Sequence, residues 1–325
     1  MFRSIAIAAA LATLAGPVLA QLQGEDASYP SKPIHIVVAA SAGGINDILA
    51  RVIGQKLAES FGQPVVVDNR PGAGTILGTE YAARSRPDGY TLLSSPMASM
   101  AVTAAVYPKL SYAPQRDFVP VSLIASYSYL LAVTNAAPVR TVAELIAHIK
   151  ANPAKANAGG ASVTFHLAIE MLKQRTGTQI QYIPYKGSHE ANLGLISGEL
   201  LLSFVDSGPA APLIKGGQFR ALATTAPLRT ASFPDLPTMA EAGVADMAVL
   251  SWSGFFAPAG TPAGIVKKLE GEIMRIVRLP DVRERLRAQE LDLVGSSSAE
   301  FARILAKDVA TWAAIARAAN ITIEP

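Results

Sequence analysis

The chain has 325 residues, half of them hydrophobic and 16% charged, which excludes a disordered protein and suggests about two domains. The formal net charge is +3, which is too small to favour nucleic acid or an anionic membrane as a partner. Cysteine is absent, so disulfides, thiol catalysis and thiolate metal sites are excluded.

The first twenty residues have the pattern of a secretory signal peptide. Arg3 precedes an apolar run from Ile5 to Leu14, and small residues follow up to an expected cleavage site after Ala20. A retained membrane anchor is the weaker alternative, because the run is short for a bilayer span. We therefore expect residues 1–20 to be removed and the mature protein to be exported.

The mature chain begins with the pattern strand, glycine loop, helix. Residues 34–40 are rich in β-branched types, which favours a buried strand, and apolar residues at helical spacing predict a helix from 45 to 61. The loop 39–44 between them, AASAGG, carries almost no side chains. It is either a plain turn into the helix or a site where free backbone N–H groups at the helix start bind an anion.

Strands and helices continue to alternate after this unit. The pattern predicts strand, helix and strand over residues 64–93. Alternation at this pace is typical of a parallel sheet with right-handed crossovers. Ligands of such sheets bind beyond the carboxyl ends of the strands, so the loops at 40–44, 70–75 and 94–97 should converge on one place.

Two long extended runs, 119–134 and 249–256, are candidates for strands that pass from one domain to the other. A second α/β series lies between them, and the remaining chain is helical. We therefore predict an α/β, bilobed protein hinged by two extended crossover strands. The expected domain 1 comprises residues 28–124 and 252–325, and domain 2 comprises 125–251. The helices expected in this part of the chain lie at 141–151, 165–176, 189–197, 262–278, 280–289 and 298–319.

Motifs of common enzymes and cofactor sites are missing from the sequence. Gly72, Gly74 and Gly78 resemble a dinucleotide loop, but its third glycine should stand at position 77, which is Leu. There is no Walker loop and no Gly-x-Ser-x-Gly elbow, and none of the four histidines has metal-ligand spacing. We therefore expect a protein that is not an enzyme and that carries no metal and no cofactor.

Two side chains leave alternatives open. His166 opens a helix just after a small-residue loop, so it is either a core histidine satisfied by the backbone or a neutral hydrogen-bond donor to a ligand. Asp206 follows a predicted strand and is either a turn former or a cleft residue. Serine, histidine and aspartate side chains can meet in space without a local motif, so an exported hydrolase using His166 and Asp206 is the less favoured alternative.

A series of short motifs follows in order over essentially the whole mature chain. The series is Tyr29-Pro30-x-Lys32-Pro33-Ile34, Gly43-Gly44-x-x-Asp47-x-x-Ala50-Arg51, VDNRPGAG at 67–74, PDGYTL at 87–92, Pro184-Tyr185-Lys186-Gly187, Pro237-Thr238-x-x-Glu241-x-Gly243, Trp252-x-Gly254 and PAGTP at 258–262. Jointly these motifs resemble the Bug-type solute receptors, which are the periplasmic substrate-binding components of tripartite tricarboxylate transporters.

The resemblance implies a type II periplasmic-binding-protein (Venus flytrap) fold that closes on a small organic acid or amino acid. It also implies delivery of the ligand to the membrane subunits of a transporter, and we expect a monomer. A sensor that signals to a membrane kinase is the alternative. The ligand contacts carried over by position are Ser41, Ala42, Gly43, Gly44, Gly74, Thr75, Ser95 and Met97 in the first domain, and Ser162, Thr164, His166, Tyr185, Lys186 and Asp206 in the second.

The sequence departs from this family in two of the expected contact loops. Ala40-Ser41-Ala42 stands where the family commonly has an aromatic residue and prolines, so the pocket wall should be smaller or more flexible. Val163 stands where the family commonly has a hydroxyl residue. Either Ser162 or Thr164 takes over that hydrogen bond, or the bond is lost.

Overall fold

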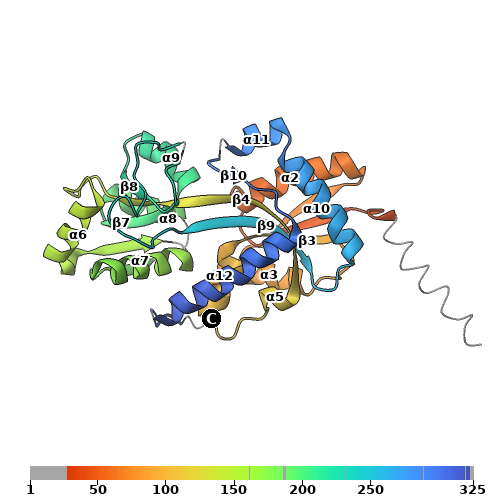
Figure 1. Cartoon of the computed structure of the whole chain (residues 1–325), viewed down its shortest axis with the longest axis horizontal. Helices are drawn as coiled ribbons and strands as arrows, with labels where there is room; N and C mark the ends of the chain where they lie inside the picture. The colour runs from red at the N-terminus through yellow and green to blue at the C-terminus, as the bar shows by residue number, and fades with distance from the viewer. Residues whose placement is uncertain are drawn as a thin grey trace, which may run out of the picture.

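The protein consists of two α/β lobes. The computed structural model describes residues 28–160, 162–185, 188–230, 232–287, 289–318 and 320–322, and the expected signal peptide lies outside them. The lobes lie side by side, and two long strands, β4 (Phe118–Val133) and β9 (Leu250–Pro258), run from one to the other (Figure 1). The α/β, bilobed architecture predicted from the sequence is confirmed.

The first lobe is built around three parallel strands. β1 (Ile34–Val38) lies between β2 (Val65–Asn69) and β3 (Thr91–Pro96). The helix α2 (Ile45–Phe61) packs its apolar stripe on these strands and ends at Gly62, whose φ of 64° is left-handed. The chain also forms η1 (Ala73–Thr75), α3 (Ile76–Ala83), η2 (Ala98–Val102), α4 (Thr103–Val106), α5 (Pro114–Asp117), α10 (Ala263–Val277), α11 (Pro280–Arg287), β10 (Asp292–Leu293) and α12 (Ser298–Ala318).

The second lobe repeats this arrangement with its own parallel strands. β5 (Asn157–Gly160) pairs with β6 (Gln181–Pro184) on one side and with β7 (Leu202–Asp206) on the other. The first helix, α6 (Val142–Ala151), begins at a capping box in which Thr141 and Glu144 exchange hydrogen bonds with each other's backbone amides. The other elements are η3 (Pro153–Lys155), α7 (Val163–Thr176), α8 (Ser188–Ser197), α9 (Ser207–Lys215) and β8 (Arg220–Thr224).

The strands that join the lobes run antiparallel to each other. Residues 118–128 of β4 pair with β9, and residues 129–133 pair with β7 and β8 of the second lobe. β9 in turn pairs with β3 of the first lobe. The sequence predicts a parallel sheet, whereas the observed sheet is mixed, because the chain leaves the first lobe along β4 and returns along β9.

Besides the short segments η1, η3 and α5, two helical segments are not predicted from the sequence. α9 contains Pro209 and Pro212, and a proline inside a helix removes one backbone hydrogen bond and obscures the helical pattern. Residues 98–106 form a π-helical turn, η2, and the short α4 in a run of mostly small residues. Each segment follows a strand, so both continue the alternation of strands and helices that the earlier elements establish.

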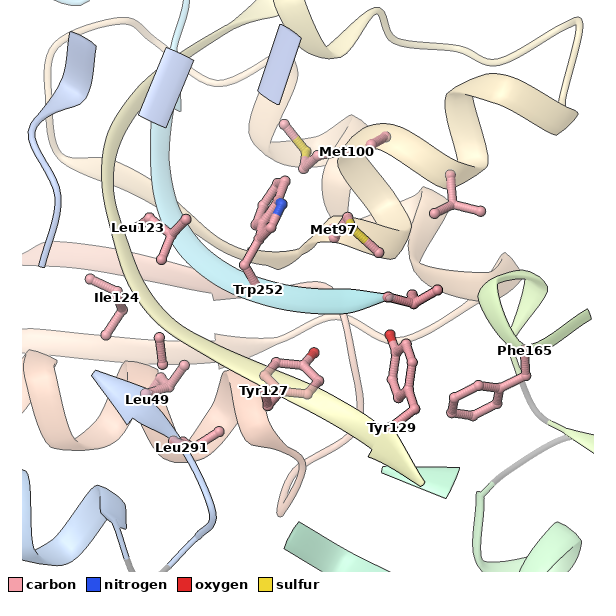
Figure 2. Packing of buried hydrophobic residues seen from close by; sticks show 14 of the residues in the cluster. Leu49, Met97, Met100, Leu123, Ile124, Tyr127, Tyr129, Phe165, Trp252 and Leu291 are labelled. Carbon is pink, nitrogen blue, oxygen red and sulfur yellow. The ribbon is translucent and has the colours of Figure 1, made fainter. Parts of the chain in front are cut away.

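The core continues through the crossover region. Trp252 of β9 packs edge to face against Phe301 of α12, with the ring centroids 4.9 Å apart, and its indole N–H donates to Asp308 at 2.6 Å. Figure 2 shows this tryptophan together with Met97, Met100 and the tyrosines of β4. Among the described helices, none has both the length and the apolar character that a membrane span requires.

Candidate functional site

The loop before α2 presents backbone amides to the solvent. Residues 41–44 are exposed, and no side chain caps the first turn of the helix. The Asp47 carboxylate accepts hydrogen bonds from the Gly43 amide at 2.9 Å and from Arg51 at 3.0 Å. Burial alone would raise the pKa of Asp47, but these hydrogen bonds lower it below its ordinary value. Asp47 therefore occupies the Gly43 amide, and the first-turn amides can serve an outside acceptor.

The loop before α3 has an unusual backbone. Ala73, Gly74 and Thr75 have φ angles of 46°, 61° and 85°, and a positive φ is strained for a β-branched residue such as Thr75. The Thr75 hydroxyl lies 2.7 Å from the hydroxyl of Ser99, and this hydrogen bond helps to hold the turn. Gly74 is exposed and Thr75 is half-buried, so both predicted contacts are at least partly accessible from the solvent.

The end of β3 buries two predicted contacts with different environments. The Ser95 hydroxyl is fully buried and has no hydrogen-bond partner among the described residues. Met97 is also buried, and its sulfur accepts a hydrogen bond from the indole N–H of Trp312 at 3.3 Å. Met97 therefore packs β3 against α12, whereas Ser95 retains a polar group that a buried site normally pairs with water or ligand.

Val163, where the sequence departs from the family, lies between two hydroxyl residues at the start of α7, and the structure shows which of the two hydroxyls has a partner. The Ser162 hydroxyl caps the helix by accepting a hydrogen bond from the Thr164 amide at 3.0 Å. The Thr164 hydroxyl is fully buried and lacks a partner in the part of the chain that the structure describes. Ser162 is thus engaged within the helix, and Thr164 is the hydroxyl that can serve a ligand.

His166 stacks on an aromatic neighbour. Its ring lies parallel to that of Tyr182, with the centroids 4.2 Å apart, and its Nε2 lies 3.9 Å from Glu170. Burial lowers the pKa of His166, with Lys173 acting in the same direction and Glu170 opposing. The neutral ring is therefore favoured, which agrees with either of the two roles that the sequence leaves open.

The predicted contacts after β6 are placed differently. The Tyr185 ring packs closely against Gly159, Gly194 and Leu200, beside a cluster of buried hydrophobic residues in the second lobe. Its hydroxyl is buried and forms no hydrogen bond with a described residue. The Tyr185 side chain therefore has a packing role in the second lobe. Lys186 lies outside the described residues.

Four further hydroxyl side chains lie on the crossover strands, and the sequence analysis did not single them out. Tyr127 and Tyr129 lie on the same side of β4 (Figure 2). Tyr127 pairs with Ser251 of β9, and Ser253 follows on β9. The hydroxyls of both serines are buried and unpartnered within the described chain. The alternation of Tyr and Ser within the run 119–134 is the signal that could have identified the tyrosines.

The tyrosine hydroxyls of β4 remain uncharged at any physiological pH. Burial raises the pKa of Tyr127 to about 12 and that of Tyr129 well above its usual value, and Ser251 opposes both increases. The Tyr129 ring packs edge to face on Phe165 of α7, with centroids 5.0 Å apart, so this strand residue touches the start of a second-lobe helix. Both hydroxyls therefore remain hydrogen-bond donors.

The last of the predicted ligand contacts, Asp206, lies at the end of β7. It pairs with Tyr129 across the two strands, and its carboxylate forms no hydrogen bond or ion pair with a described residue. Burial raises its pKa from 3.8 to about 6. Asp206 also lines a cavity of about 10 Å³ with Asn192 and Ser188, which is the space of about one water molecule. An unpaired acid is therefore present beside the tyrosines.

We refer to these hydroxyl groups as the hydroxyl cluster. Its members come from both lobes and from the crossover strands. The four serine and threonine hydroxyls lack a hydrogen-bond partner among the described residues, and Ser251 lies close enough to both tyrosine hydroxyls to lower their pKa values. Hydroxyls donate and accept equally well, so such a set suits a polar ligand held without a permanent salt bridge. The cluster comprises Ser95, Tyr127, Tyr129, Thr164, Ser251 and Ser253.

A separate and larger groove lies between α7 and α12. It has a volume of about 880 Å³ and is lined by both tryptophans, Trp252 and Trp312, with Met171 on the α7 side. It shares only Met97 with the predicted contacts and only Ser251 with the hydroxyl cluster. The converging βα loops that usually hold ligands in α/β proteins lie elsewhere, so size alone does not make this groove the site.

The described residues offer no conventional catalytic or metal-binding constellation. No group of three or more histidine, aspartate or glutamate side chains comes together within them as a metal site. His166 faces Glu170 and Tyr182, and no hydrogen bond joins it to a serine within the described chain.

Sequence comparison gives matches over nearly the whole chain. Residues 49–321 match the family described as "Tripartite tricarboxylate transporter family receptor". The chain is 35% identical to Protein BugT of Bordetella pertussis over 318 residues, which cover 96% of this chain and 95% of that protein. It is also 35% identical over 307 residues to the "UPF0065 protein in gbd 5'region" of Cupriavidus necator, with 93% and 92% covered.

Solved structures of periplasmic solute-binding proteins are also similar to this chain over nearly its whole length. Rpa4515 of R. palustris, solved with adipate, is 33% identical and superposes with a TM-score of 0.84 over 91% of this chain and all of that chain. MatC of Rhodopseudomonas palustris, solved with bound malate, is 28% identical with a TM-score of 0.80, covering 88% and 99%. The periplasmic binding protein BugD is 28% identical with a TM-score of 0.81, covering 91% and 100%.

Proposed function

Since the chain belongs to the tripartite tricarboxylate transporter receptor family, we propose that it captures a small carboxylate between its lobes and delivers it to a membrane transporter. The Bug-type resemblance and the periplasmic-binding fold expected from the sequence are both confirmed. The homologues and structural neighbours are solute-binding receptors and not enzymes, which also agrees with the sequence. The hydrolase alternative has no support in this family.

The observation that carries the proposal is the hydroxyl cluster. A buried polar group without a partner costs about 1–3 kcal/mol, and several such groups on facing elements are retained only where something pairs with them. Ser95 comes from the first lobe, Thr164 from the second, and Ser251 from a crossover strand. A ligand that pairs with hydroxyls of both lobes must lie between the lobes.

The carboxylate end of the ligand belongs at the start of α2. The uncapped amides after Gly44 and the positive end of the helix dipole favour an anion there. The predicted contacts Gly74 and Thr75 border the same edge of the parallel strands β1 and β2. Backbone donors and water can hold a carboxylate without a fixed cation, so release to a transporter stays possible.

The ligand class follows from the size of the site and from the relatives. Rpa4515 was solved with adipate and MatC with malate, both short dicarboxylates. The small residues Ala40, Ser41 and Ala42 leave the first-lobe wall without a large side chain. We infer a linear acid of similar length, bound as one molecule per chain.

Thermal-shift screening of the mature chain against mono-, di- and tricarboxylates and amino acids tests this function. A binding protein should be stabilised by one chemical class, by several degrees at saturation, and the ligand should be recovered unchanged. Chemical turnover of a bound compound, or the absence of any stabilising acid, would contradict the proposal. Uptake of the labelled acid by cells with and without the receptor then tests delivery to the transporter.

A further inference from the structure

The strongest unexplained feature of the site is the carboxylate of Asp206. The residue ends β7 opposite Tyr129, and its negative charge contributes to the raised pKa values of Tyr127 and Tyr129. None of the hydrogen bonds or ion pairs of the described residues involves this carboxylate. An acid that a protein keeps half-buried without a partner lacks the compensation that such groups usually receive.

The neighbours of Asp206 do not supply that compensation internally. Tyr127 and Tyr129 stay protonated, but neither hydroxyl bonds to the carboxylate within the described chain. The cavity shared with Asn192 and Ser188 has room for about one water molecule. Water can occupy that cavity, and the carboxylate keeps acceptor capacity that a ligand donor could use.

We propose that Asp206 forms the second-lobe end of the ligand site and accepts a hydrogen bond from the ligand, so that the preferred ligand is a carboxylate carrying a hydroxyl or ammonium donor. This inference rests on the proposed function. The loop before α2 takes the anionic end, where the helix start favours negative charge. Asp206 takes the donor, and a second carboxylate placed beside it is repelled.

In this arrangement the two lobes recognise different parts of the ligand. The first lobe recognises the feature shared by all carboxylates, and the second lobe distinguishes among them by what else they carry. A site built to hydrogen-bond a donor rejects an analogue that lacks it, because its own polar groups are then left unpaired. Asp206 is thus assigned as a specificity-determining residue.

Isothermal titration calorimetry at pH 8 with succinate, malate, aspartate and 4-aminobutanoate tests this inference, and adipate with 6-aminohexanoate extends it to longer acids. Within each series, acids with a donor should bind at least about tenfold more tightly than the acid without one. In Asp206→Asn, which keeps size and one acceptor oxygen, this preference should shrink to about twofold or less, with succinate and adipate unchanged or improved.

Asp235→Asn is the matched control, since Asp235 is an exposed second-lobe acid whose removal changes the net charge equally. It should retain the wild-type preference. An equal loss for all acids in Asp206→Asn, or equal binding of succinate and malate by the wild type, would overturn the inference while leaving the proposed function intact. Failure of every acid to bind would instead overturn the proposed function and this inference together.

Discussion

Individual hydroxyl and carboxyl groups determine the character of the site. Asp206 and the hydroxyl cluster are polar groups that the fold positions without pairing them, and each therefore weakens the empty protein. Such groups are retained where binding energy later compensates them. Stability and ligand binding should accordingly respond in opposite directions when these side chains are replaced, which is a measurable signature of a binding role.

The pH dependence of stability tests the environment of Asp206. Its pKa is about 6 in the folded chain and 3.8 in the unfolded one, so the folded state binds the proton more tightly and loses stability as pH rises from about 4 to 6. The loss is roughly 2–3 kcal/mol at most. Asp206→Asn should remove it and raise the melting temperature at pH 7–8. Equal melting temperatures of wild type and variant at both pH 4 and pH 8 would contradict this environment.

Thr164 and Ser162 form a matched pair at the start of α7. Thr164→Val removes an unpaired buried hydroxyl at constant volume, so the free energy of unfolding should stay the same or rise by up to about 1 kcal/mol, while acid binding weakens. Ser162→Ala removes the helix cap and should cost about 1 kcal/mol of stability. Urea denaturation and titration calorimetry measure both effects. A destabilised Thr164→Val would assign Thr164 to the structural framework.

The individual residues of the candidate site could be predicted only in part from the sequence. The loop 41–44 and the start of α7 are continuous in sequence, so their small residues and caps are visible there. The Val163 question could not be settled, because the choice between Ser162 and Thr164 depends on which hydroxyl faces the helix amides. Ser251 and Ser253 were missed, since their meeting with Tyr127 depends on the register of two strands far apart in the chain.

Secondary-structure elements were more accessible to sequence analysis. The helical spacing in α2, α10 and α12 and the strand patterns of β1 and β4 predict their positions closely, because each buries one regular face or run. α9 escaped prediction because prolines interrupt its pattern. Strand direction also escaped, because antiparallel pairing of β4 and β9 depends on the path of the whole chain.

Gly78 allows α3 to lie close to the loops that follow β1 and β2. A Cβ at this position would lie 2.6 Å from the carbonyl oxygen of Arg70 and 2.7 Å from the Cα of Ala39, both on loops that border the site. Gly78→Ala should therefore destabilise the protein by about 1–3 kcal/mol and weaken acid binding. Thermal unfolding and calorimetry measure the two losses.

Gly271 provides the control for this substitution. It lies exposed within α10, and a Cβ there would meet nothing within 4 Å. Gly271→Ala should raise the free energy of unfolding by about 0.4–1 kcal/mol and leave binding unchanged, because alanine favours the helix. If both variants behaved alike, the close approach at Gly78 would have no structural importance.

The whole molecule is organised around the two crossover strands. The proposed domain boundaries, after residues 124 and 251, fall inside β4 and β9, so any movement of one lobe against the other bends these strands. α7 of the second lobe contacts η2 and α12 of the first, so this helix lies at the boundary between the lobes. Closure of the lobes about these strands would enclose a ligand between them.

The central claim is that the amides at the start of α2 hold a carboxylate between the lobes. Gly44 has an extended backbone, and an added Cβ there would meet only the Ser41 carbonyl oxygen, at 3.8 Å, so a side chain fits the empty protein. In Gly44→Val that side chain would occupy the place of the anion. The protein should fold normally and lose binding.

Titration calorimetry of wild type and Gly44→Val with the acid that stabilises the wild type is the most direct test. The wild type should bind one acid per chain, and Gly44→Val should give no binding heat while its melting temperature without ligand stays within about a degree of the wild type. Binding of the acid by Gly44→Val with wild-type affinity would contradict the account.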